Sequence, residues 1–576
     1  MRQAKRWHIK EFDKQKAAIL ARELGVSPVI AGLLVARGYD DTAKAQGFLA
    51  PAWEQLHDPA QMLGMDVAVE RVQRAIVNKE KILVYGDYDV DGTTGTVVLR
   101  RALQMLGAET GYHVPHRFTE GYGIRQDVLE KAKAKGYGLV ISVDCGIRAH
   151  EPLVWARENG LDIIITDHHL PDEDEGSPPA LAVLNPNQAN CPYPDKNLAG
   201  VGVGFKLAHA LFRAKGWEAK ISGFLKIVAL GTIADMADLT GENRAIVALG
   251  LADLAGATNI GLRALMEVSG FGPGNDVSAM DVGFRIGPRI NAAGRMDAAR
   301  AVVELFEAKD WHTARQLAQQ LDERNRERQL VQAEIARYAQ EEFAASGGLA
   351  AQSHVAVIAG EGWHRGVIGL AASRITERLN RPSVVISLDE EGLGHGSARS
   401  IEAYHLLNGL TACADLFVKF GGHSHAAGLT IKGENVAELR RRLNEHAAAH
   451  IADDDLIPEV RIDAELAPAE VTLELVQELK RLEPYGMGHP RPIFATRNLR
   501  LTAAPFVMKD KHLKLRLANG DAGPPLEAVW WDGVHESGEA TLQAQERIEL
   551  AYAPEANTWR GDTRLQLVVK DLQKMG

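Results

Sequence analysis

The feature that most constrains the fold is a series of short apolar segments, each followed by a stretch of helical periodicity. Five such segments occur in the first half of the chain, at residues 81–85, 110–114, 139–143, 162–166 and 180–184. Helical patterns at 94–106 and 126–135 lie between them and end at Gly107 and Gly136, as helices commonly do. This alternation predicts a mainly parallel, doubly wound α/β sheet.

The rest of the chain predicts further units, because 576 residues exceed what one compact core usually holds. The pattern is mostly helical from about residue 224 to 300, and a charged helical stretch follows at 310–345. A second α/β unit has strand patterns at 355–358, 384–387 and 429–431 and helical ones at 367–379 and 436–449. From about residue 458, β-rich runs are typical of a small antiparallel barrel resembling an OB-fold.

We therefore predict an α/β multidomain chain. Its expected parts are an N-terminal leader (1–52), a first α/β domain with a helical extension (53–309), a connecting helix (310–347), a second α/β domain (348–455) and an OB-like β-barrel (456–576).

Composition excludes several classes of protein. Hydrophobic residues at 46% and charged residues at 24% are ordinary globular values, which excludes a disordered chain. No apolar run approaches the ~18 residues of a membrane span, and the basic N-terminus lacks the apolar segment of a secretory signal. The net charge of −11 still permits a local nucleic-acid channel. Cys145, Cys191 and Cys413 form no paired motif, so we expect reduced thiols in a cytoplasmic protein without a membrane partner.

The first apolar segment ends in three closely spaced carboxylates, Asp87, Asp89 and Asp91. This density of negative charge requires a cation. A calcium-binding EF-hand loop is one alternative, but its twelfth position would be Val98 where that loop needs a bidentate Glu, and the run follows a strand.

Two further segments end in polar residues, the third at Asp144 and the fourth at Asp167, His168 and His169. The carboxyl ends of parallel strands line one crevice, so we expect these side chains to converge there. Asp235, after another apolar stretch, could complete the site. Singly, Asp144 or Asp235 could be a helix cap, and either histidine an ordinary hydrogen-bonded residue. Carboxylates and imidazoles without a thiolate suit Mn²⁺ or Mg²⁺.

The strings YGDYDVDG, VDCG, DHH and GTIAD, in this order, resemble the four motifs of the DHH phosphoesterase superfamily. Longer strings resemble its bacterial exonucleases specific for single-stranded DNA, and they extend over almost the whole chain. These are RFTEGYGI, LAGVGVGFK, IGPRINAAGRM, GWHRGVIGLAASR, GGHSHAAG and PYGMGHPRPIF.

The resemblance implies a site for two Mn²⁺ or Mg²⁺ ions. Its implied metal ligands are Asp89, Asp91, Asp144, His168 and Asp235, with Asp87 an alternate ligand or a partner of the ligands. Asp144 would bridge the two ions, and His169 would stabilise charge on the scissile phosphate. Related pyrophosphatases have a histidine ligand where this chain has Tyr85, which predicts weaker binding of the first ion.

A second group of residues is predicted to contact DNA. The resemblance identifies the second α/β unit as a DHHA1 domain whose Gly421-Gly422-His423 loop holds the nucleic-acid end. Ser397 and Arg399 could bind a terminal 5′-phosphate, unless they form a tight turn with a surface arginine. Within residues 285–300, Arg285, Arg289, Arg295 and Arg300 outweigh the single acid Asp297. These arginines and Asn291 are predicted to contact the backbone, unless the basic residues here form a solvated face.

Two other patterns leave alternatives. Gly200, Gly202 and Gly204 with Lys206 superficially resemble a nucleotide loop but match no such motif, so close helix packing is preferred. Trp530 and Trp531 should face opposite sides of a strand, so at most one can stack on a base.

The resemblance implies 5′-to-3′ hydrolysis of single-stranded DNA to 5′-mononucleotides by a two-metal mechanism, in recombination and repair. Expected partners are single-stranded DNA, a single-strand DNA-binding protein and a recombination helicase, and a monomer is expected. The alternatives are a DHH phosphodiesterase acting on oligonucleotides or cyclic dinucleotides, and a catalytically silent single-strand-binding scaffold.

Overall fold

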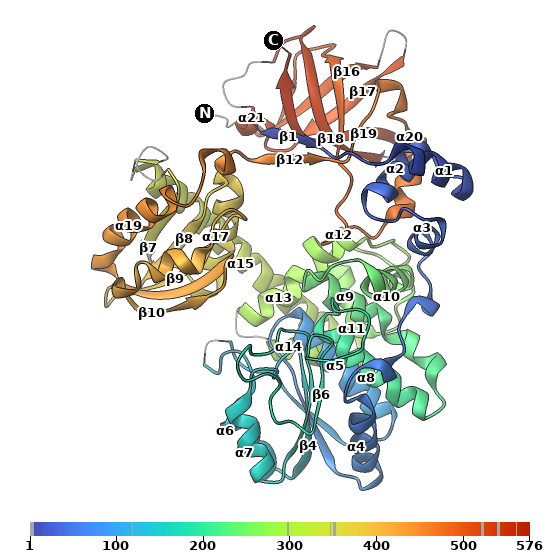
Figure 1. Cartoon of the computed structure of the whole chain (residues 1–576), viewed down its shortest axis with the longest axis vertical. Coiled ribbons are helices and arrows are strands. Elements are labelled where there is room, and N and C mark those ends of the chain that lie inside the picture. The colour runs from blue at the N-terminus through green and yellow to red at the C-terminus, as the bar shows by residue number, and fades with distance from the viewer. Residues whose placement is uncertain are drawn as a thin grey trace. The chain divides into compact units, whose positions relative to one another are not determined.

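The computed structural model describes residues 5–117, 119–295, 299–345, 347–348, 353–519, 523–537, 542–559 and 561–575 (Figure 1). The chain divides into two compact units. Unit 1 comprises Met1–Leu49, Gln329–Leu482 and Arg491–Gly576, and unit 2 comprises Ala50–Arg328 and Glu483–Pro490. The N-terminal residues therefore fold with the C-terminal half of the chain.

Unit 2 contains the predicted parallel sheet, in the strand order β3-β2-β4-β5-β6. Its strands are β2 (Lys81–Tyr85), β3 (Thr110–His113), β4 (Tyr137–Val143), β5 (Asp162–Thr166) and β6 (Ala182–Leu184). Every neighbouring pair is parallel. The strand order reverses between β2 and β4, and such a reversal opens a crevice at the carboxyl ends of the strands.

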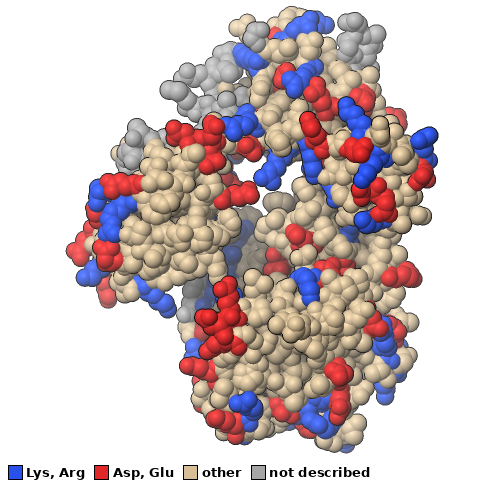
Figure 2. Space-filling model, in the orientation of Figure 1, with Lys and Arg blue, Asp and Glu red and all other residues tan. Residues whose placement is uncertain are grey.

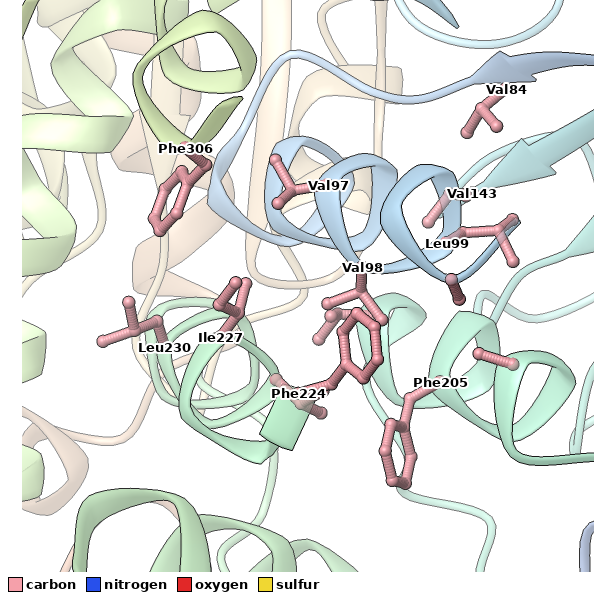
Figure 3. Close-up of a cluster of buried hydrophobic side chains, with 14 of the residues drawn as sticks. Val84, Val97, Val98, Leu99, Val143, Phe205, Phe224, Ile227, Leu230 and Phe306 are labelled. Atoms are coloured by element: carbon pink, nitrogen blue, oxygen red, sulfur yellow. The ribbon is translucent and has the colours of Figure 1, made fainter. Parts of the chain in front are cut away.

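Helices cover both faces of this sheet, because successive side chains of a strand point to opposite sides. In β2, Ile82 and Val84 join the larger core, whereas Leu83 and Tyr85 join a second cluster. Figure 3 shows the larger core, where Val84 and Val143 lie near α5, α8 and α9. Helix α4 (Met65–Val77) precedes the first strand of the sheet. The helices that follow its strands are α5 (Val90–Met105), α6 (Gln126–Ala134), α7 (His150–Glu158) and α8 (Gly200–Ala214).

The predicted helical region is confirmed. It contains α9 (Leu225–Ala234), α10 (Gly241–Ala252), α11 (Ile260–Val268), α12 (Ala279–Asp281), the π-helical turn η5 (Val282–Ile286), α13 (Gly287–Arg295) and α14 (Ala299–Glu307). The long charged helix is α15 (Trp311–Ala345), and the division between the two units falls within it.

Unit 1 contains a mixed five-stranded sheet in the order β10-β11-β9-β8-β7. Its elements are β7 (Ala356–Glu361), α17 (Arg365–Leu379), β8 (Ser383–Leu388), β9 (Leu393–Arg399), α18 (Leu406–Thr411), β10 (Phe417–Gly422), β11 (Ala426–Lys432) and α19 (Val436–Ala448). Strands β9 and β10 were missed from the sequence. Since Ser397 and Arg399 lie on β9, the interpretation of that segment as a tight turn is wrong.

The C-terminal sheet of unit 1 has the order β13-β14-β18-β19-β17-β16-β15. Its strands are β13 (Ala464–Glu465), β14 (Phe494–Arg500), β15 (Phe506–Met508), β16 (His512–Asn519), β17 (Gly523–Trp530), β18 (Arg547–Trp559) and β19 (Asp562–Lys574). A bridge between Leu501 and Leu517 joins the end of β14 to β16 and closes five of these strands into a ring. The β17–β19 pair is parallel, so the OB-like sheet is mainly rather than wholly antiparallel.

The N-terminal segment forms a separate two-stranded sheet, in which β1 (Arg6–Ile9) pairs in parallel with β12 (Glu459–Ile462). Its apolar side chains pack against Ala495 of β14 and Ala551 of β18. Unit 1 also contains helices α1 (Lys14–Leu24), α2 (Pro28–Ala36), α3 (Thr42–Leu49), α20 (Leu473–Leu479) and α21 (Gly533–Glu536). Among the described helices, none combines the length and apolar character of a bilayer span. All three cysteines lie in described parts of the chain, where they are buried thiols.

Candidate metal centre and nucleic-acid-binding residues

The predicted acidic and histidine residues of unit 2 gather at the carboxyl edge of the parallel sheet. We call Asp87, Asp89, Asp91, Asp144, His168, His169 and Asp235 the acid–histidine cluster. Three sets of its ligand atoms each lie within 4.8 Å of one another. The sets are Asp87 with Asp89 and Asp144, Asp91 with His168 and Asp235, and Asp144 with His168 and His169. Residues from four separate stretches of sequence thus form one site.

Two residues of the first acidic run are fixed by helix N-termini. Asp89 is the N-cap of α5, and its carboxylate accepts a hydrogen bond from the Gly92 N–H at 3.0 Å. Asp91 is buried in the first turn of α5, and its two oxygens accept from the N–H groups of Gly200 and Val201, at 2.7 Å each. These two donors are the first two residues of α8, where the positive end of the helix dipole favours an anion.

The glycine-rich start of α8 therefore holds a carboxylate of the chain itself. Lys206, the lysine that suggested a nucleotide loop, is buried, forms an ion pair with Glu242 and donates to the His57 carbonyl at 2.7 Å. A Cβ atom at Gly200 would lie 2.6 Å from the Asp144 Cβ, so the glycine also allows the start of α8 to approach the turn that follows β4. The preferred interpretation of this segment as a close-packing element is confirmed.

Asp144 and His168 face each other at the centre of the cluster. Asp144 directly follows β4, has a left-handed φ of 60° and donates its N–H to the Thr166 carbonyl at 2.9 Å. Its Oδ1 lies 3.2 Å from His168 Nε2. Oxygens of Asp91 and Asp235 each lie 3.9 Å from the same nitrogen. His168 Nε2 is therefore surrounded by three carboxylates.

Asp167, which sequence reasoning did not assign a role, organises the two histidines. Its buried Oδ1 accepts from the N–H groups of His168 and His169 at 2.8 and 3.2 Å and lies 2.8 Å from His169 Nδ1. Its Oδ2 accepts from the Ile147 N–H at 2.9 Å. The Tyr122 hydroxyl lies 3.1 Å from His169 Nδ1 and donates to the Asp144 carbonyl at 3.3 Å. The only sequence signal for Asp167 was its place beside the two histidines.

The electrostatics of the cluster are those of uncompensated negative charge. Burial, followed by the charge of Asp89, raises the pKa of Asp87 to about 8 and that of Asp91 to about 7. Burial and the charges of Asp91 and Asp89 raise the pKa of Asp235 to about 9 and that of Asp144 well above its usual value. Burial lowers the pKa of His168 to about 4, so its imidazole is neutral at pH 7.

These residues fit a divalent cation. Within the described part of the chain, the buried atoms Asp87 Oδ1, Asp144 Oδ1 and His168 Nε2 have no hydrogen-bond partner. Buried polar atoms are normally paired, so three such atoms in one cluster indicate a ligand that binds there. Carboxylate oxygens with a neutral imidazole nitrogen suit Mn²⁺ or Mg²⁺. Tyr85, the last residue of β2, is buried in the second hydrophobic cluster, and its hydroxyl donates to the Gly123 carbonyl at 3.0 Å.

The predicted DNA-contacting arginines of unit 2 are largely engaged within the protein. Arg285 donates to the Ser269 carbonyl at 2.8 Å and lies over the Phe271 ring. Arg289 donates to Asp322 of α15 at 2.8 Å and to the Val268 carbonyl at 3.2 Å.

The rest of this predicted surface lies on α13 or beside it. Asn291 and Arg295 are half-buried on α13. The helix packs against the acidic loop, because a Cβ at Gly294 would lie 2.3 Å from the Tyr88 carbonyl oxygen. Asp297 lies outside the described residues. DNA contact by this stretch stays a prediction.

The predicted phosphate-binding residues of unit 1 share one region of the mixed sheet. Ser397 on β9 pairs with Gly428 on β11, which in turn pairs with Gly421 on β10. A Cβ at Gly369, in the first half of α17, would lie 3.1 Å from both Ser397 Oγ and Arg399 Nη2.

The glycine loop borders this row of residues. A Cβ at Gly421 would meet no atom within 4 Å, so the sheet is open there. Gly422 ends β10, and the exposed His423 follows, its N–H donating to the Ala426 carbonyl at 2.8 Å. Burial lowers the pKa of Arg399, whose guanidinium donates to Ser397 Oγ at 3.1 Å.

The two tryptophans face opposite ways, as predicted. Trp530 is 2% exposed, whereas Trp531 is 55% exposed and packs edge-on against His512. Only Trp531 is therefore available to stack on a base. On the face drawn in Figure 2, Lys and Arg side chains are interspersed with Asp and Glu, in keeping with the modest net charge.

Three family models match the chain. They are the DHH family N-terminal domain at residues 81–232, the DHHA1 domain at 351–449 and the RecJ OB domain at 462–571.

Curated relatives match over most of their length. The single-stranded-DNA-specific exonuclease RecJ of Bacillus subtilis strain 168 is 38% identical over 569 residues, which cover 98% of this chain and 70% of that protein. The RecJ of Escherichia coli K12 is 34% identical, over 89% of this chain and 90% of that protein.

Solved structures agree with these matches. The crystal structure of RecJ from Thermus thermophilus in complex with Mn²⁺ has a TM-score of 0.83 at 29% identity, covering 99% of this chain and 80% of that one. A structure of the same protein with Mg²⁺ has a TM-score of 0.77 at 28% identity, covering 99% of this chain and 79% of that one.

Proposed function

The chain belongs to the RecJ family of single-stranded-DNA-specific exonucleases, and we propose that its acid–histidine cluster is the site of DNA hydrolysis. Three observations on this chain support the proposal: the cluster lies at the carboxyl edge of the DHH sheet, it has the donor set of a Mn²⁺ or Mg²⁺ site, and it holds three buried polar atoms that make no hydrogen bond. These three atoms carry the proposal, because buried polar atoms are normally hydrogen-bonded and a bound cation would satisfy them.

We assign the metal ligands to Asp89, Asp91, Asp144, His168 and Asp235, with Asp87 as a further ligand or a partner of the ligands. Two bound ions would neutralise the phosphate oxygens and lower the pKa of a bound water, which is the chemistry that two-metal nucleases use. The chain supplies the geometry. The α8 N-terminus fixes Asp91, and the left-handed turn at Asp144 places its carboxylate beside His168.

His169 is proposed to contact the scissile phosphate. Burial lowers the pKa of its imidazole, but the hydrogen bond and charge of Asp167 outweigh burial, so the pKa is raised overall. With Nδ1 directed at Asp167, the free ring nitrogen is Nε2. A protonated His169 would donate from Nε2 to a phosphate oxygen and stabilise the charge that develops there.

We propose that the row of Ser397, Arg399, Gly421, Gly422 and His423 binds the 5′-terminal phosphate. The hydroxyl, the guanidinium and the open glycine backbone together offer the donors that a phosphate monoester needs. Recognition of that end would give the 5′-to-3′ polarity and release 5′-mononucleotides. Arg285, Arg289, Asn291 and Arg295 are proposed to contact the backbone of the strand.

A long single strand with an open or a blocked 5′ end tests these assignments together. We expect Mn²⁺-dependent release of mononucleotides from the open end, no release from the blocked end, and loss of turnover in Asp144→Ala with DNA binding retained. Arg399→Ala should reduce the preference for a 5′-phosphate and leave turnover at saturating DNA nearly unchanged. Full activity of Asp144→Ala would refute the assigned site, and attack from the 3′ end would refute the polarity.

Neither alternative function has an observation of its own in its favour. The OB domain match accounts for a segment that the oligonucleotide and cyclic-dinucleotide enzymes usually lack, and every acid of the DHH motifs is present, unlike in a silent scaffold. We further propose a monomeric, cytoplasmic enzyme that acts in recombination and repair with a single-strand DNA-binding protein and a helicase.

A further inference from the structure

An exposed apolar surface lies beside Asp235 in unit 2. We call Met236, Met280 and Phe284 the apolar rim; their exposures are 64%, 52% and 79%. Phe284 is the most exposed aromatic side chain among the described residues. Exposed apolar patches bordered by polar residues commonly mark binding surfaces.

The backbone of this region holds the rim toward solvent. Met236 directly follows Asp235 and has a left-handed φ of 61°. Phe284 lies at the middle of η5, and π-helical turns of this kind occur frequently at functional sites. Met280 precedes Phe284 by four residues, so the two side chains lie on a similar face of the same helical stretch.

The elements that carry the rim pack against the end of α9, where Asp235 lies. A Cβ at Gly287 would lie 3.3 Å from the Ala234 Cβ, and one at Gly283 would lie 3.9 Å from Ile233 Cγ2. Figure 1 shows α9, α12 and α13 grouped in the same part of unit 2. The segments that carry the rim therefore lie next to the end of α9, and Asp235 of the acid–histidine cluster directly follows that helix.

We propose that Phe284 is a stacking platform for one nucleobase of the single-stranded substrate, a few nucleotides from the scissile phosphate. Unpaired bases expose their aromatic faces, and proteins that bind single strands without sequence preference stack them on aromatic side chains. The half-exposed Arg285, held by Asp281 and the Ser269 carbonyl, is a fixed cation next to the ring in sequence. The proposal rests on the assignment of hydrolysis to the acid–histidine cluster.

The test compares Phe284→Ala and Phe284→Trp with the unchanged enzyme in single-turnover release of the first nucleotide, over a range of enzyme concentrations. Stacking predicts that Phe284→Ala raises the half-saturating concentration by about 5- to 150-fold, while the rate at saturation stays within about twofold. Phe284→Trp should retain affinity. Val77→Ala, at a side chain of similar exposure (80%) on α4, is the matched control and should change neither value.

Strands with a single abasic site, moved one position at a time from the 5′ end, identify the contact. When the abasic site is at the position that stacks on Phe284, the substitution Phe284→Ala should no longer raise the half-saturating concentration, because that strand has no base there. An equal penalty at every position, or none at any position, would overturn the proposal. Packing of the rim against another part of the chain would instead lower the melting temperature of Phe284→Ala without any positional pattern, which also overturns it. Cleavage by Asp144→Ala would show separately that the hydrolysis site is misassigned.

Discussion

Gly200→Ala offers a sharp test of how the metal centre is assembled. Gly200 is the first residue of α8, and its N–H is one of the two donors to Asp91. A Cβ added there would lie 2.6 Å from the Asp144 Cβ, 2.8 Å from its Oδ1 and 2.9 Å from its Cα. The closest atoms include backbone, so rotation of the Asp144 side chain alone cannot relieve the overlap.

The size of the effect follows from these distances. Ordinary contact begins near 3.4 Å, so the Asp144 Cβ and the new methyl group would have to separate by about 0.8 Å (3.4 minus 2.6). A shift of about 1 Å at a reacting group can reduce the rate by about 10²-fold, and disturbing the residues that support a ligand typically weakens metal binding by about 10- to 100-fold. We expect Gly200→Ala to lower both the turnover rate and the affinity for Mn²⁺ by these factors. Overpacking should also reduce the free energy of unfolding by about 1–3 kcal/mol.

The matched control is Gly202→Ala, two residues further along the same helix. Its Cβ would meet its nearest neighbour, Leu198 Cδ2, at 3.4 Å, and helix propensity alone would stabilise the protein by up to about 1 kcal/mol. Turnover of single-stranded DNA, Mn²⁺ titration by calorimetry and thermal unfolding should be measured for both variants. Wild-type turnover and Mn²⁺ affinity in Gly200→Ala, with an unchanged overall helix content by circular dichroism, would refute the close approach of α8 to Asp144.

Three further outcomes are expected. Asp167→Asn should lower kcat by about 10- to 100-fold with little change in KM, because His169 loses its charged partner; steady-state kinetics check this, and an unchanged kcat would contradict it. Glu242→Gln should destabilise unit 2 by about 3–5 kcal/mol in urea unfolding, because the buried ammonium of Lys206 keeps its bond to the His57 carbonyl but loses its compensating carboxylate; a loss below about 1 kcal/mol would exclude this role. The Mg²⁺-induced rise in melting temperature should grow between pH 6 and pH 9. In the metal-free protein the carboxyls of Asp91, Asp87 and Asp235 have pKa values of about 7, 8 and 9, and they must lose their protons to bind Mg²⁺. Because these pKa values are raised by folding, the metal-free protein also becomes less stable as the pH rises above about 4. A rise that does not change with pH would show that these acids are not ligands.

The sequence predicted the first sheet well because its strands are continuous apolar runs. The bounds of β2 and β5 agree with the predicted ones, and α15 begins one residue later than expected. Strands β9 (LGHGSAR) and β10 (FVKFGG) were missed, since glycines and charged residues obscure the alternation on which strand prediction depends. Helix α5 starts four residues before the predicted position because Asp89 acts as its cap, a role hidden by its apparent function as a metal ligand.

The members of the site were easier to predict than their partners. The three strand ends could be placed together from topology alone, but no local pattern indicates that the Gly200 and Val201 N–H groups bind Asp91, 109 and 110 residues earlier. The pairing of Arg289 with Asp322 likewise depends on how α13 packs against α15. Contacts of this kind are set by tertiary packing, which periodicity does not record.

The acids of the cluster differ in what compensates their charge, and this difference explains why the site requires a cation. Burial raises the pKa of Asp167, but the hydrogen bond from His169 and the N–H group of Ile147 outweigh it, so this carboxyl stays ionised. Asp91 has two N–H donors yet still has a raised pKa, because its burial and then the charge of Asp89 outweigh them. For Asp235, burial and neighbouring charges all act in one direction. Asp167, which positions the histidines, is therefore ionised without a metal, whereas Asp144 and Asp235 depend on a bound ion to become ionised. Metal binding and deprotonation of these two acids must occur together.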